Sequence, residues 1–162
     1  MELIDGPRSE WRARTPTLGI RVVTPFRGML AERDRLLSEL SAWLADGAIE
    51  TDGPFFLRLH VVDMAGEMDI EVGVAGVDHP GDERVRSGVM PAGTYALLAY
   101  RRSSLEANRT LQAWAQEREL SFAVQTEPDG DHWTGRFEIL RTDPRREPRK
   151  TRWVTELAFL LR

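Results

Sequence analysis

One pattern of residues occurs twice along this chain, and the repeat restricts the possible folds more than any other feature. In each copy an L-x-A-W segment on a predicted helix precedes a strand that opens with phenylalanine, and an apolar strand holding a glutamate completes the copy. The matched positions are Leu40 to Trp43 with Leu111 to Trp114, Phe56 with Phe137, and Glu71 with Glu156. Their shared order indicates two similar halves.

Hydrophobic spacing predicts the elements of each half. Apolar residues spaced three, four and seven apart predict helices over 29–46 and about 105–119, with Ser103 and Glu106 at capping-box spacing before the second. β-branched and aromatic runs predict strands over 18–25, 55–62, 68–77, 85–90, 94–100, 136–142 and 154–161, with a loop near 128–131.

The order of these elements predicts an α+β fold in a single domain over 18–162, made of two repeats at about 18–80 and 81–162. Two strand–helix–strand–strand halves would form an antiparallel sheet with both helices on one face. Trp43 and Trp114 would pack there as core residues, each worth about 3–5 kcal/mol on truncation. Residues 1–17 are polar, contain Pro7 and Pro16, and are expected to form an N-terminal arm.

Composition excludes several classes of function. The net charge of −4, from 22 basic and 26 acidic residues, does not favour nucleic-acid binding. Without cysteine there are no disulfides or thiolate metal sites, and His60, His79 and His132 lack metal-ligand spacing, so no cofactor or metal is expected. The sequence shows no signal peptide and no apolar run that would span a membrane, and we expect a cytoplasmic protein.

Glu156 is the most informative single residue. Along 154–161 the side chains of both strand faces are almost wholly apolar, which predicts a central strand covered on both sides. A buried carboxylate needs compensation. An arginine in a structural ion pair or a cationic ligand would provide it, and the sequence leaves both alternatives open.

Other candidates for a binding pocket are aromatic or acidic. Tyr95, Tyr100, Trp153 and Phe137 lie in the second half, where aromatic faces around a carboxylate would suit an apolar cation, although Phe137 also fits an ordinary core position. Glu71 shares its strand face with small residues that leave room for a ligand. Glu138 alternates with residues of mixed character, which predicts an exposed side chain.

Several of these segments together resemble the GyrI-like small-molecule-binding domain family, which includes the effector-binding domains of regulators such as BmrR and Rob. The segments are Pro91 to Ala96, the helix with Trp114, Phe137-Glu138-Ile139, Trp153 to Leu157, and Met68 to Val74. The resemblance covers about 18–162 and implies a cleft between the two halves that contains Glu156. It also implies a runner-up activity, since one branch hydrolyses strained natural products with a glutamate and a tyrosine, here Glu156 with Tyr95 or Tyr100.

Three functions follow as hypotheses. The first is binding of an apolar or cationic small molecule, of the multidrug-binding kind, for sensing or sequestration; the second is a hydrolase with Glu156 as general acid or base. The third is a protein-interaction module that holds a partner segment in the cleft. Only about 17 residues precede the first predicted strand, so we expect no direct DNA binding by this chain.

Overall fold

The two helices form where the apolar stripes predict them. A computed structural model describes all residues, 1–162, and places α1 at Met29–Asp46 and α2 at Ser104–Glu117. The hydroxyl of Ser103 accepts a hydrogen bond from the Glu106 amide, which confirms the predicted N-cap of α2. No helix of the structure combines the length and apolarity needed to cross a membrane.

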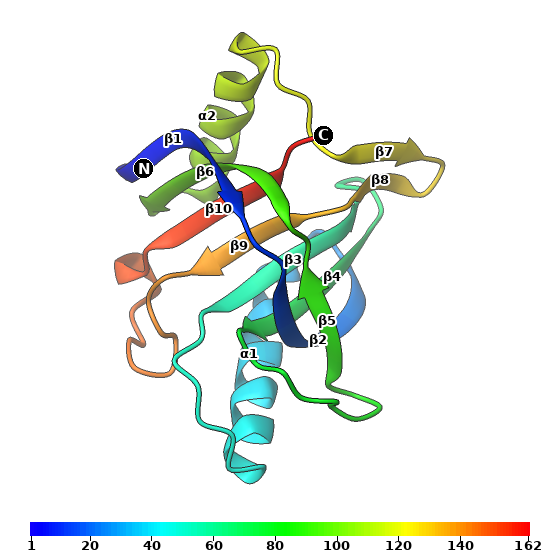
Figure 1. Cartoon of the computed structure of the whole chain (residues 1–162), viewed down its shortest axis with the longest axis vertical. Coiled ribbons are helices and arrows are strands. Elements are labelled where there is room, and N and C mark those ends of the chain that lie inside the picture. The colour runs from blue at the N-terminus through cyan, green and yellow to red at the C-terminus, as the bar shows by residue number, and fades with distance from the viewer.

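Ten strands, all paired antiparallel, form one sheet with the order β1-β6-β10-β9-β3-β4-β2-β5, and β8 attaches β7 at one end of β3 (Figure 1). The strands are β1 (Glu2–Arg12), β2 (Thr15–Pro25), β3 (Phe55–Val62), β4 (Glu67–Ala75), β5 (Arg86–Met90), β6 (Gly93–Arg101), β7 (Val124–Glu127), β8 (Gly130–Trp133), β9 (Arg136–Leu140) and β10 (Thr155–Leu160). The order β1-β2-α1-β3-β4 recurs as β5-β6-α2-β9-β10, with the hairpin β7–β8 inserted.

The first strand of each half pairs with the other half. β1 pairs with β6, and β5 pairs with β2, although residues 13–14 alone link β1 to β2 and residues 91–92 alone link β5 to β6. In the sheet order β1 and β6 lie at one end, and β2 and β5 lie at the other. The short links therefore join strands from opposite ends, and the sheet must curl to bring those ends together. The expected arm over 1–17 is therefore wrong: its polar residues fit a strand because β1 lies at the edge of the sheet, where one side remains in water.

The curled sheet has an outer face and an inner face. Both helices pack on the outer face, α1 with β2 and β4 and α2 with β6, as the fold class predicted. The inner face holds a separate apolar cluster that includes Phe56, Tyr95 and Phe137. Gly73 permits this packing, because a Cβ there would lie 2.4 Å from the Phe56 ring. Figure 1 shows α2 and α1 at opposite ends of the molecule.

The helix tryptophans differ from the expectation. Trp43 and Trp114 are only partly buried, at the margins of their clusters. Trp43 donates its indole N–H to Asp82 over 2.8 Å, and the Arg118 guanidinium lies 4.8 Å from the Trp114 ring centroid. An indole reaches past the sheet surface to a polar partner, so shorter leucines take the deepest positions of the stripe.

We therefore expect Leu111→Ala to lower the free energy of unfolding by about 2–5 kcal/mol, because its side chain is wholly buried between α2 and the sheet. Trp114→Ala should lower it by less, since the indole already contacts solvent. Denaturant unfolding of both variants measures the difference. An equal or larger loss for Trp114→Ala would contradict the packing described here.

Candidate functional site

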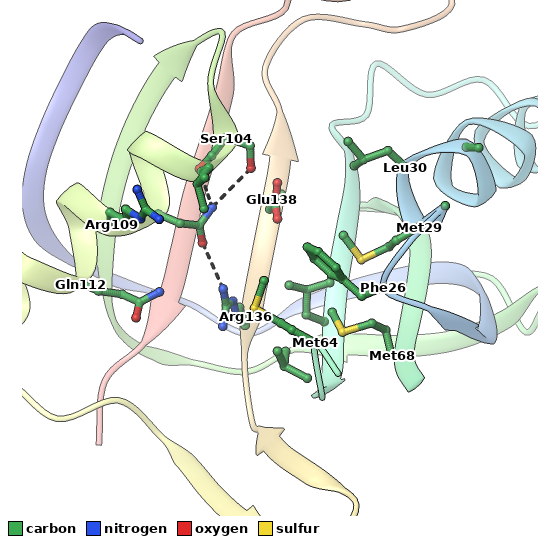
Figure 2. Close-up of a pocket in the computed structure, with 16 residues that line it drawn as sticks. Phe26, Met29, Leu30, Met64, Met68, Ser104, Arg109, Gln112, Arg136 and Glu138 are labelled. Carbon is green, nitrogen blue, oxygen red and sulfur yellow. Dashed lines mark hydrogen bonds between the residues drawn. The ribbon is translucent and has the colours of Figure 1, made fainter. Parts of the chain in front are cut away.

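A cavity of about 480 Å³ lies on the outer face, between the first turn of α1 and the stretch of α2 from Ser104 to Gln112. It lies over the seam where β9 of the second half pairs with β3 of the first. Nine of its sixteen lining residues are hydrophobic, so the walls suit an apolar molecule. Figure 2 shows Phe26, Met29 and Met68 on one side of the cavity and Ser104, Arg109 and Gln112 on the other.

Glu138 lies between these two walls (Figure 2). Strand alternation in β9 turns Phe137 and Ile139 to the inner face and Glu138 to the helices. Its side chain is buried, and its carboxylate has neither a hydrogen bond nor an ion pair within the protein. Burial raises the pKa of Glu138, and the more distant charges of Arg136 and Arg33 only partly oppose this effect.

Two arginines, Arg109 and Arg136, line the same cavity, and Arg136 is the more deeply buried of the two. One guanidinium nitrogen donates to Asn108 Oδ1 over 3.0 Å, and the group lies 4.5 Å from the Trp133 ring centroid and 4.6 Å from that of Phe159. Its Nε is buried without a partner, and burial lowers the pKa of the guanidinium. The amide and the two rings hold Arg136 in place, so the Glu138 carboxylate remains unpaired.

The structure places Glu156 elsewhere. It is buried in β10, as predicted, but it lies on the inner face, away from this cavity. Arg12 donates to one carboxylate oxygen over 2.6 Å and Arg141 to the other. Arg12 belongs to β1, so this ion pair fastens the first strand over the sheet. Of the two alternatives for Glu156, this geometry provides the structural ion pair.

Three other predicted residues also lie on the inner face. Tyr95 donates its hydroxyl hydrogen to the Pro91 carbonyl over 2.7 Å, and its ring is 6.3 Å from that of Phe137. Both rings border a cavity of only about 30 Å³, room for about one water molecule. Glu71 is separate from them and bonds the His60 ring over 2.8 Å. These residues do not form one site.

The remaining two predicted residues lie on the helix side. Tyr100 packs in the cluster beneath α2, where burial raises its pKa to about 12. Trp153 packs with the α1 cluster and donates its indole N–H to the Glu147 carbonyl over 2.7 Å. Neither lines the cavity.

The runner-up hydrolase required a tyrosine beside Glu156, and the structure does not bring one there. Tyr95 pairs with Leu160 in the register of β6 and β10, four residues along from Glu156, or roughly 13 Å. Tyr100 faces the opposite side of the sheet. The structure therefore offers no Glu156–Tyr dyad.

Sequence reasoning missed Glu138 and Arg136. Their strand face carries Arg136, Glu138, Leu140 and Thr142, a mixture that resembles a solvated face. One signal was present: on this face the strands that flank β9 carry large apolar residues, Leu57 and Leu59 in β3 and Leu157 and Phe159 in β10, which indicates a covered face.

Comparisons with known proteins concern the fold alone. No protein-family model and no curated protein matches the sequence. The structure is similar to EcmrR, solved in a complex with DNA, with a TM-score of 0.71 and 14% identity over 95% of this chain and 56% of that one. The chain thus spans little more than half of EcmrR.

Two further solved structures are similar over nearly their whole length. SAV2435 bound to tetraphenylphosphonium has a TM-score of 0.61 and 14% identity, covering 100% of this chain and 94% of that one. A hydrolase from Listeria innocua has a TM-score of 0.58 and 10% identity, covering 96% and 91%. These likenesses support the GyrI-like fold that the sequence motifs imply.

Glu156→Gln should lower the free energy of unfolding by about 1–3 kcal/mol, because two arginines would lose the charge they share. Glu10→Gln is the matched control, since Glu10 belongs to the same ion network but its side chain is 41% exposed, and its loss should be within about 0.5 kcal/mol. Thermal melting compares the two. A Glu156→Gln variant as stable as wild type would contradict a structural ion pair.

Proposed function

We propose that this protein binds a lipophilic organic cation in the cavity between α1 and α2, as a member of the GyrI-like family that senses or sequesters its ligand. The observation that carries the proposal is Glu138: a buried carboxylate without a protein partner, at an apolar cavity.

The electrostatics favour a cationic ligand. An ionised carboxylate without a partner in an apolar site is costly, which is why its pKa is raised. A cation in the cavity would supply the missing charge while the walls exclude water. Arg136 does not meet this need, because no nitrogen of its guanidinium lies within 4.0 Å of a Glu138 oxygen.

The walls favour a lipophilic and adaptable partner. Met29, Met64 and Met68 line the cavity, and unbranched thioether side chains repack easily around ligands of different shape. Phe26 and Leu30 are large apolar side chains that remain 40% and 49% exposed beside the opening, as expected for surface that a ligand covers.

One structural neighbour suggests tetraphenylphosphonium as the ligand with which to test this proposal. SAV2435 was solved with tetraphenylphosphonium, a permanent cation enclosed by aromatic rings. A permanent cation carries no proton of its own, so any pH dependence of its binding reports on the protein.

Glu138→Gln should weaken tetraphenylphosphonium binding at least ~10-fold, since a desolvated charge pair is worth about 2 kcal/mol. The same substitution should raise the melting temperature near neutral pH, because it removes an unpaired buried charge. Quenching of the fluorescence of the five tryptophans measures binding. Glu117→Gln, an exposed change on α2, is the control and should bind like wild type. Equal affinity in Glu138→Gln would refute the proposed site.

Binding of tetraphenylphosphonium should also weaken as the pH falls. Because the pKa of Glu138 is raised, protonation neutralises the site at a higher pH than for an ordinary carboxylate of about 4.3. Without ligand, Glu138 binds its proton more tightly in the folded than in the unfolded protein. The free energy of unfolding therefore falls as the pH rises from the pKa of an ordinary glutamate through the raised pKa of Glu138. Titrations toward lower pH should show this loss of binding in wild type at a pH above the range in which an ordinary glutamate titrates, and a flat profile in Glu138→Gln over the same range. A flat profile in both would contradict the role of Glu138.

A further inference from the structure

A second cavity, also of about 480 Å³, lies on the inner face of the sheet and differs in character from the first. None of its ten lining residues is hydrophobic. We propose that this cavity, here called the arginine groove, binds a small oxyanion with more than one negative charge, such as inorganic phosphate or the phosphate group of a small ester. The groove is defined by Gly19, Arg21, Arg58, His60, Glu71, Glu83, Arg84, Arg86, Ser87 and Gly88.

Its charged groups converge from separate segments of the chain. Four arginines and one histidine face two glutamates, in a protein whose net charge is −4. Arg21 comes from β2, Arg58 from β3 and Arg86 from β5, while Arg84 precedes β5. Guanidinium groups that approach a cavity from several directions match the geometry of a tetrahedral oxyanion.

Two of the four arginines already have carboxylate partners. Arg21 forms two hydrogen bonds with Asp69, of 2.8 and 2.9 Å, and Arg84 forms two with Glu39, of 2.7 and 3.0 Å. These pairs fix the walls of the groove and contribute little uncompensated charge.

The other two have no carboxylate partner. Arg58 donates to the carbonyls of Val89 and Thr134 over 2.9 and 2.8 Å, and Arg86 donates only to the Glu83 carbonyl over 3.3 Å. Backbone carbonyls orient a guanidinium but leave its charge unneutralised. These two arginines are therefore the groups that an anion would pair with.

Arg58 carries the greater desolvation. Its guanidinium lies 4.9 Å from the Phe137 ring centroid, its Nε is buried without a partner, and burial lowers its pKa. Arg12, Arg21 and Arg84, which contact carboxylates, have raised pKa values instead. The Glu71 carboxylate opposes this effect only in part and forms no hydrogen bond with Arg58. A half-buried cation that forms no ion pair gains more from a bound anion than an exposed one does.

Glu71 is compatible with an anion in the groove. One of its oxygens bonds His60 over 2.8 Å, and the carboxylate packs against Gly19, where a Cβ would lie 2.2 Å from the other oxygen. Glu71 is thus held against β2 by Gly19 and His60. Its negative charge would keep a bound anion at the other end of the groove. The Ser87 hydroxyl at the β5 side offers a further donor.

Isothermal titration calorimetry with inorganic phosphate and pyrophosphate at low ionic strength tests the proposal. Wild type should bind pyrophosphate saturably, and Arg86→Gln should weaken that binding at least ~10-fold, the loss of one charge-assisted contact. Arg86 is exposed, so its substitution should leave folding intact; Arg58→Gln removes two backbone contacts and requires a melting curve alongside.

Two controls separate this site from other effects. Arg14→Gln removes an exposed arginine outside the groove and should leave affinity within twofold of wild type. Glu138→Gln should bind pyrophosphate normally, because the sheet separates the two cavities. Absence of saturable binding to wild type, or equal weakening in Arg86→Gln and Arg14→Gln, would overturn the proposal.

Discussion

The exchange of leading strands between the two halves is the constraint on which the rest of the structure depends. β1 and β5 each leave their own half through a two-residue link and complete the opposite end of the sheet. Links this short force the sheet to curl, which encloses the apolar cluster of the inner face and leaves both helices outside. α1 packs chiefly on β2 and β4 and α2 chiefly on β6, so the part of the β3–β9 seam around Glu138 lies between the two helices. An outer-face cavity opens there because neither helix reaches across.

The curled sheet also separates two electrostatic environments. On the inner face the Glu156 carboxylate is paired with Arg12, the last residue of β1, and with Arg141, which directly follows β9. On the outer face Glu138 is equally buried but unsatisfied. Both carboxylates are buried, and they differ in whether a charged partner lies beside them. Only the carboxylate without a partner would be stabilised by a bound cation.

The sequence predicts the elements well and the site poorly, for a physical reason. Apolar spacing is local, so α1 was bounded correctly at both ends and both helices were placed on one face. Alternation along β10 also identified Glu156 as buried. Whether a buried charge is paired depends on partners far away: Arg12 lies 144 residues from Glu156. Glu138 was missed because the character of a short strand depends on its neighbours, and the polar β1 was missed because an edge strand carries no apolar pattern.

The unpaired buried charges gather at one place in the fold. Arg136 and Glu138 lie on β9, and Arg58 lies opposite Phe137 in the adjoining β3, so all three occupy the seam between the halves. Away from it, Glu156 is paired with Arg12 and the partly buried Asp69 with Arg21. Unpaired charge lowers stability wherever it is desolvated, and a structural role would be served better by a matched pair. Arg136 and Glu138 line the outer-face cavity and Arg58 lines the arginine groove, which associates this unpaired charge with ligands and not with folding.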